Sequence, residues 1–440
     1  MFNKIKFCSF ICLPVLFSSL QCMATDLKNV YAMALSNDPQ YKQAQASFQA
    51  TLEAKPQARA QLLPEVSLSA NTSTNDQDID TANFGASGEV DFNSHGYSLD
   101  LRQPIFHVDR FLSLSQADSQ IQQAQAELDF AHQDLIIRVS ERYFNVLAAM
   151  DNLEFVRGEK RSLSRQLEQA NQRFEVGLTA ITDVQEAQAG YDRAVANEIS
   201  AENLLDNTRE ALREVTGEYT ELLSPLSDSM TLVEPIPNEI DTWTEISREQ
   251  NLQVLAIKYA LETTRKEINI QRAGHLPTVD LVANHGFNST GGRFGGTDVD
   301  FTAIGLELNV PIFEGGAVNS RVRESEHRYT ESMQRLEQQY RAAQRETRES
   351  YLGVISGISQ VKALKQALVS TETALQATQA GFEVGTRTAV DVVSSERATL
   401  EAKRDYARAR YNYIGDSLEL KRAAGTLSPD DVDKINNWLE

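Results

Sequence analysis

Cysteine is nearly absent from the chain. The few examples lie close to its start, at Cys8, Cys12 and Cys22. If residues 1–24 are removed, no thiol remains. That excludes disulfides and thiolate metal sites, so the rest of the protein must be held together by packing alone.

The first 24 residues have the pattern of a cleavable secretory signal peptide. Two lysines precede the apolar run FCSFICLPVLFSSL, and small residues at 22 and 24 fit cleavage before Thr25. The run is too short, and too interrupted by Pro14, to span a membrane. Lipidation of Cys22 is the alternative, although Leu20 and Gln21 fit poorly before a lipidated cysteine.

Positive charge and long apolar runs are also scarce. The formal net charge is −20, and loss of the two leader lysines changes it to −22. This balance excludes a general nucleic-acid binder. No later window approaches 18 uninterrupted apolar residues, so no transmembrane helix is expected. Any passage through a membrane then requires strands that close into a barrel.

Proline is missing from two long intervals, between Pro104 and Pro225 and between Pro311 and Pro429. Both intervals are rich in Ala, Gln, Glu, Arg and Leu, which are strong helix formers. The apolar stripe in the first interval has spacings that average near 3.5 residues, as in a coiled coil. Its members are Leu128, Leu135, Val139, Tyr143, Val146, Met150 and Leu153.

The intervals predict two helices of unusual length. From His107 to Gly177 the helix has roughly 67 residues, or about 100 Å, and 318–385 gives a second of similar length. Helices that outrun any globular core usually form coiled coils. We expect Gly158 and Gly353 to loosen them locally, and Pro56 to kink or end an earlier short helix.

Alternating apolar and polar residues predict four strands outside these intervals. The segments are VSLSAN (66–71), YSLDLR (97–102), VDLVANH (279–285) and TAIGLELNV (302–310), joined in pairs by polar loops at 72–96 and 288–298. Hairpins on a soluble domain remain an alternative. Weak alternating strands, polar loops, an export signal and no apolar helix together favour an outer-membrane barrel. Four strands cannot close a barrel, whereas twelve from a homotrimer would leave a lumen.

The chain repeats itself. RFEVGLTAITDVQEA begins at 173, and the similar GFEVGTRTAVDVVSS begins 208 residues later at 381. Each half is expected to run helix, strand, loop, strand, very long helix, turn, helix. The predicted organisation is a first repeat at 25–224, a linker at 225–240, a second repeat at 241–428 and a C-terminal tail at 429–440.

Over nearly all of the chain after the leader, the sequence resembles the TolC family of outer-membrane efflux proteins. The most specific segments are YFNVL, RFEVGLTAITDVQ, GHLPTVDL, PIFEGGAVNS and VGTRTAVDVV. The resemblance implies a mainly α protein with a membrane β-barrel. Three chains would form a 12-stranded barrel, four strands per chain, continued by a long α-helical coiled-coil duct in the periplasm. It also implies a gated exit channel for efflux pumps and type I secretion.

The resemblance places both turns at the periplasmic tip. In the family, an arginine at the place of Arg387 ties the closed gate through the aspartate that matches Asp183. Phe382 and Ser394 replace the family's usual tyrosine and aspartate. The predicted gate residues are Thr182, Asp183, Phe382, Arg387, Asp391 and Ser394. The predicted adaptor-docking tips are Val176, Gly177, Leu178, Thr179, Val384, Gly385 and Thr386.

The charged residues at the turns could instead have purely structural roles. Asp183 and Asp391 open the returning helices, where an acid favours the positive end of the helix dipole and caps it. Arg387 alone would be an exposed arginine of little energetic weight.

Nothing in the sequence supports catalysis or a cofactor. The six histidines are scattered, and GGRFGG lacks the GK[ST] of a phosphate loop. The expected partners are two more copies of the chain, outer-membrane lipid, a periplasmic adaptor (membrane fusion) protein and an inner-membrane transporter of RND, ABC or MFS type. No nucleic acid is expected. A passive porin would not need helices of this length, and a non-membrane coiled-coil scaffold would not need the strands.

Overall fold

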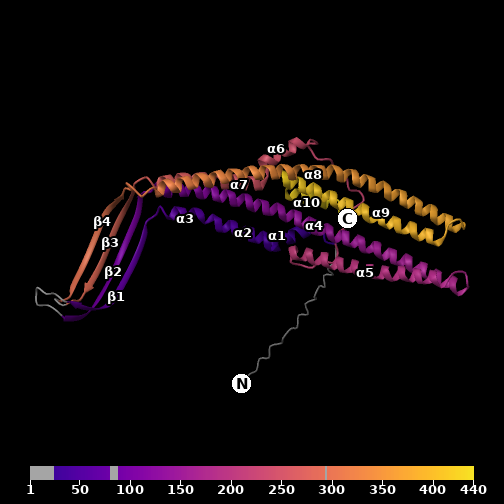
Figure 1. Cartoon of the computed structure of the whole chain (residues 1–440), viewed down its shortest axis with the longest axis horizontal. Helices are drawn as coiled ribbons and strands as arrows, with labels where there is room; N and C mark the ends of the chain where they lie inside the picture. The colour runs from indigo at the N-terminus through magenta and orange to yellow at the C-terminus, as the bar shows by residue number, and fades with distance from the viewer. Residues whose placement is uncertain (1–23, 80–87, 293–294) are drawn as a thin grey trace, which may run out of the picture.

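The computed structural model describes residues 24–79, 88–292 and 295–440. The molecule is long and narrow (Figure 1). A sheet lies at one end, two helix turns lie at the other, and very long helices connect them. The predicted signal peptide falls outside the described residues, apart from Ala24.

The sheet is antiparallel, with its strands in chain order: β1 (Glu65–Ile79), β2 (Gly88–Phe106), β3 (Thr278–Thr290) and β4 (Thr297–Asn309). Pairing of β2 with β3 joins the two halves of the chain. All four predicted strands are therefore confirmed.

The predicted loop at 72–96 was too long, because β1 continues to Ile79 and β2 begins at Gly88. Polar side chains bond across this extension. Thr74 Oγ1 donates to Asn93 Oδ1 at 3.0 Å, and Asn75 Nδ2 donates to Ser94 Oγ at 3.0 Å. Strand pairing here has no apolar alternation to reveal it, which is why the pattern missed it.

Two pairs of helices form the body of the molecule. The very long members are α4 (Val108–Glu175, 68 residues) and α8 (Ala317–Glu383, 67 residues). Each turns back into a helix of 36 residues, α5 (Ile181–Thr216) or α9 (Ala389–Ala424). Toward the turns these helices lie in the order α5, α4, α9, α8. The predicted long helices are confirmed.

The glycines inside these helices do not loosen them, so that expectation was wrong. Gly158 and Gly353 lie within continuous helix. A Cβ at Gly158 would approach Leu400 Cδ1 to 2.6 Å, and one at Gly353 would lie 3.4 Å from Asp416 Cγ. The missing side chains let α9 approach both α4 and α8 closely.

Shorter helices lie along the long ones. They are α1 (Leu27–Asn37), α2 (Pro39–Leu52), α3 (Ala54–Ala60), α6 (Ile240–Gln250), α7 (Leu252–Ala273) and α10 (Pro429–Asn436). The break between α2 and α3 confirms the effect expected of Pro56. In an unbroken helix its ring would clash with the carbonyl of Leu52, four residues earlier.

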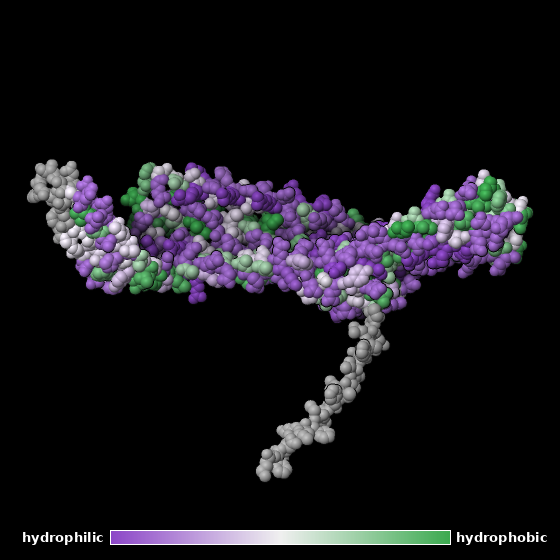
Figure 2. Space-filling view, turned by 90° about the horizontal axis from the view of Figure 1, so that it is seen from below, coloured by the Kyte–Doolittle hydropathy of each residue, from purple (hydrophilic) through white to green (hydrophobic). Residues whose placement is uncertain are grey.

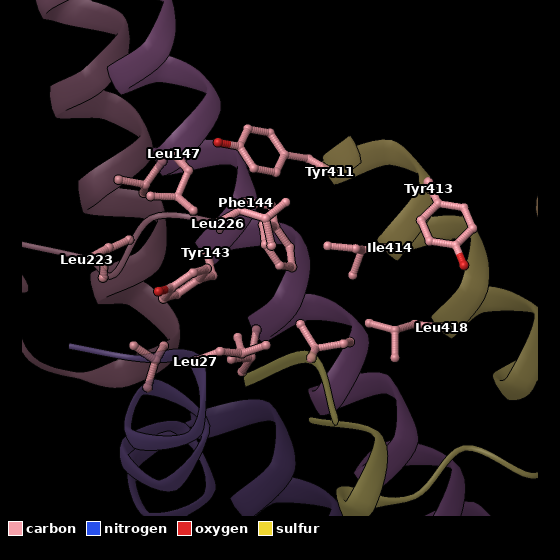
Figure 3. Close-up of a cluster of buried hydrophobic side chains, with 14 of the residues drawn as sticks. Leu27, Tyr143, Phe144, Leu147, Leu223, Leu226, Tyr411, Tyr413, Ile414 and Leu418 are labelled. Carbon is pink, nitrogen blue, oxygen red and sulfur yellow. The ribbon is translucent and has the colours of Figure 1, made fainter. Parts of the chain in front are cut away.

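The main core lies partway along the helices, at a level we call the waist (Figure 3). Leu27, Tyr143 and Ile414 are almost fully buried there. The Tyr143 hydroxyl donates to the Ser224 carbonyl at 2.7 Å. Isolated bridges join Thr25 to Leu223 and Leu226 to Leu439, so both ends of the described chain and the linker between the repeats meet at this level.

None of the helices among the described residues is both long enough and apolar enough to span a membrane.

Candidate functional site

The two turns opposite the sheet have the same backbone. At the first, Gly177 has φ +73°, its N–H donates to the Phe174 carbonyl, and the Leu178 N–H donates to the Arg173 carbonyl. The second repeats this at Gly385, with φ +78°. This is the Schellman ending of a helix, which needs a left-handed residue after the cap and therefore favours glycine.

The predicted docking residues are exposed on these turns, except Thr179, which is half-buried. Val176, Leu178 and Val384 have exposed fractions of 68%, 77% and 75%. Hydrophobic side chains gather at this end of the molecule (Figure 2). Phe174 and Phe382 lie just behind them and are 43% and 45% exposed. Each turn thus presents an apolar tip on a rigid helix pair.

Side chains close the two turns differently. In the second, Thr388 is the N-cap of α9 and forms a capping box with Asp391: the Thr388 N–H donates to Asp391 Oδ2 at 2.8 Å, and the Asp391 N–H donates to Thr388 Oγ1 at 3.2 Å. These bonds, with a smaller contribution from the charge of Arg387, hold the pKa of Asp391 below its usual value. The capping interpretation of Asp391 is therefore correct.

In the first turn the cap residue is Ala180, which offers no side-chain bond. Instead the Thr179 hydroxyl donates to Asp183 Oδ2. Among the described residues, Asp183 Oδ1 accepts no hydrogen bond. Asp183 therefore keeps an acceptor that Thr179 does not use.

Arg387 does not pair with Asp183 within one chain. Its backbone N–H donates to the Gly381 carbonyl at 3.1 Å, and its Cγ lies against Gly381. Within the described ranges its guanidinium forms no ion pair. Thr182 and Ser394 are exposed, and neither makes a side-chain hydrogen bond in the described chain.

A cleft of about 430 Å³ separates the two helix pairs just behind the turns. Arg173, Asp183 and Glu186 line it on the first pair, and Thr388 to Val390 line it on the second. The structure therefore brings Asp183 to face the start of α9, immediately after Arg387. Of the predicted gate residues only Asp183 lines this cleft, and Arg387 precedes the residues that form its opposite wall.

Sequence reasoning missed the ion pairs that join the helix pairs above this cleft. Buried Glu159 accepts from Arg397 Nε at 2.9 Å. Glu396 accepts from Ser162 Oγ at 2.7 Å and from Arg165 at 2.6 Å. Gly158 beside them, which admits Leu400, was the one available sign of close contact at this level.

Comparison with known proteins defines the class. The sequence pattern described as "Outer membrane efflux protein" matches residues 30–218 and 243–426. The chain therefore belongs to the outer membrane efflux protein family, which comprises transport proteins. It is located in the outer membrane, and the predicted role of an exit duct for efflux and type I secretion is confirmed.

Within the family the chain is a close TolC homologue. It is 38% identical to the outer membrane protein TolC of Vibrio cholerae over 95% of this chain and 94% of that one. It is 35% identical to TolC of Escherichia coli, over 96% and 86% of the two chains. The fold is similar to that of the Campylobacter jejuni CmeC outer membrane channel, with a TM-score of 0.78 at 16% identity, over 94% and 90%. The predicted fold class is confirmed.

Proposed function

We propose that three copies of this chain form one gated duct whose tips dock on a periplasmic adaptor, which connects them to an inner-membrane transporter of RND, ABC or MFS type. Drugs, proteins or both would pass through it. The observation that carries the proposal is the pair of apolar turns held at the far end of helices of 68 and 67 residues. A passive pore has no need of such a reach.

The trimer follows from the sheet. Its outer strands, β1 and β4, each have one strand neighbour in the described chain. Open sheet edges are not tolerated in lipid, so each β1 would pair with β4 of a neighbouring copy. Three sheets of four strands then close as twelve, with outer-membrane lipid around them.

The cleft behind the turns supports the proposed gate. Asp183 has an unused acceptor, and Arg387 lies beside the opposite wall of the cleft. In the closed duct Arg387 would reach Asp183 within one protomer or between two. One exposed pair contributes about 0.2–1 kcal/mol, so three symmetric pairs would add about 0.6–3 kcal/mol. Docking of the adaptor would break them.

Docking can be tested by crosslinking in living cells. A photoreactive residue at Leu178 or Val384 should capture the adaptor, whereas one at exposed Ile199, farther along α5, should capture much less. Fractionation should recover a detergent-resistant trimer with the outer membrane. Equal capture at all three positions would place the partner elsewhere. A protein missing from the outer membrane would favour the scaffold, and an unpartnered trimer would favour the porin.

A further inference from the structure

A groove of about 450 Å³ lies between α4, α8 and α9 near the waist, and none of its lining residues belongs to another element. The cavity formed with α6, α10 and the linker uses Tyr413, Ser417 and Lys421 of α9, whereas the groove uses Asn412, Asp416 and Glu419. At 3.6 residues per turn these two sets lie about 130° apart around α9, although Leu418 lines both cavities. The groove therefore opens away from α6 and α10.

Glycine creates the space in this groove. Gly353 and Gly357 of α8 lie under the carboxylate of Asp416, and a Cβ at Gly415 would meet nothing within 4 Å. Glycine inside a helix costs about 1 kcal/mol relative to alanine. The resulting volume lies within the range of small-molecule sites, about 300–1,000 Å³.

One buried hydroxyl and two carboxylates along the groove lack partners among the described residues. The Ser140 hydroxyl, on a residue only 3% exposed, has no hydrogen-bond partner in the part of the chain that the structure describes. In the described chain Glu141 and Asp416 form no ion pair, while Glu419 pairs with Arg422 at 2.8 Å. Burial, and then repulsion by Glu419, raise the pKa of Asp416. An unsatisfied buried polar group costs about 1–3 kcal/mol, so the Ser140 hydroxyl indicates a missing ligand, while the more exposed Glu141 and Asp416 add negative charge beside it.

Aromatic side chains supply an apolar wall. The rings of Phe144 and Tyr411 stack with centroids 5.5 Å apart and an interplanar angle of 25°. Both residues line the groove, together with Ile137 and Leu418. An acidic rim beside a flat aromatic wall suits a cation with an apolar body.

We propose that this groove is a binding site for drug-sized organic cations that contain a flat apolar ring system. The proposal rests on the proposed duct. In the proposed duct, the face that carries α6 and α10 is too bulky for the inside of a closed ring, so the face that contains the groove would line the lumen. A metal ion does not fit, because no group of His, Cys, Asp and Glu in the described residues is arranged to hold one. Anions are disfavoured by the three carboxylates.

The test measures equilibrium binding of ethidium to the purified trimer in detergent, by fluorescence anisotropy, with anionic 8-anilinonaphthalene-1-sulfonate as the opposite probe. We expect saturable binding of ethidium only. The triple variant Glu141→Gln/Asp416→Asn/Glu419→Gln should weaken it by about tenfold or more. The matched control, Asp206→Asn/Glu210→Gln/Glu214→Gln on α5, removes the same charge outside the groove and should change affinity by less than about twofold.

Gly415→Leu provides a second arm, because a Cβ at this groove-lining position has no described atom within 4 Å and the rest of the leucine side chain would occupy the groove. It should abolish saturable ethidium binding while the trimer still forms. Unsaturable binding, equal loss in the two triple variants, or full binding in Gly415→Leu would overturn the site. Normal export in cells with no ethidium binding overturns only this inference, whereas export that needs neither turn overturns the proposed function.

Discussion

The two helix turns share one backbone and differ in how their side chains close it. Gly177 and Gly385 have nearly the same positive φ. Thr388 and Asp391 cap the second returning helix reciprocally, whereas Ala180 leaves the first without such a cap. A duplicated turn can therefore keep its shape while one copy is fixed internally and the other keeps a carboxylate oxygen for a different partner.

The largest expected effect tests the glycine that both turns share. Gly177→Trp or Gly385→Trp should abolish export, because a bulky side chain at the tip blocks end-to-end docking. The left-handed conformation costs about 1–2 kcal/mol for a residue with a Cβ, too little to unfold the protein. Export assays, with outer-membrane trimer measured as the control, check this. Full export in both variants would remove the turns from docking.

The next largest expected effect tests the charged residues that distinguish the two turns. Arg387→Ser should raise resting conductance by about 3- to 150-fold, since three exposed pairs are lost together. Asp183→Ala should do the same, and the double variant should leak little more than the worse single one. Planar-bilayer recordings measure this, with Arg408→Ser on α9 as control. Fully additive leaks would mean that Arg387 and Asp183 make separate contacts.

A smaller effect concerns Asp391 and cations in the lumen. Asp391→Asn should weaken block by a trivalent cation from the periplasmic side by roughly tenfold, because a ring of three carboxylates becomes neutral. Asp192→Asn on α5 serves as control. Since Ser394 contributes no charge, Asp391 should account for most of the effect. Anion-selective currents would contradict the assignment.

The capping role of Asp391 also predicts that the stability of the first turn of α9 depends on pH. The folded pKa of Asp391 is lowered, so its cap is fully formed above the ordinary value of 3.8 and is lost as the pH falls through the lowered pKa. Amide protection in the first turn of α9, relative to the intrinsic exchange rate at each pH, should therefore fall only at acidic pH, and Asp391→Asn should remove this step. An unchanged step in that variant would assign it to another group.

The smallest expected effect comes from removing the cap of one returning helix and adding a cap to the other. Thr388→Ala should weaken the start of α9 by about 0.5–2 kcal/mol, and Ala180→Thr should strengthen α5 by a similar or smaller amount. Ala180 already has the extended φ and ψ of a cap, −82° and 157°. Hydrogen exchange of the first-turn amides measures both. If Ala180→Thr changes nothing, the Thr179–Asp183 bond already does the work of a cap.

Much of this architecture could be predicted because it depends on local rules. The absence of proline marked α4 and α8, and the repeated Val-Gly marked both turns. Period-two segments located all four strands, although not the polar ends of β1 and β2. The capping of Asp391 was an open alternative that only side-chain geometry could decide.

The remaining features depend on distant contacts. Nothing in the sequence pairs Glu159 with Arg397, which lies more than 200 positions away, and charged residues on a helix usually face solvent. The groove is similar: Gly353 looked like a weak point in a helix until its place beside Asp416 was known. A single sequence gives helix faces but not which faces meet.

The waist has a consequence for the order in which the chain acquires its structure. Its bridges join Thr25 to Leu223 and Leu226 to Leu439. The residues near Leu439 are synthesised after both repeats, so we expect each helix pair to form from its own contacts before the waist closes. Contacts between such distant residues form slowly, because a long loop must be ordered first. Protease resistance in pulse-labelled chains should therefore appear along the helix pairs first and around Tyr143 last.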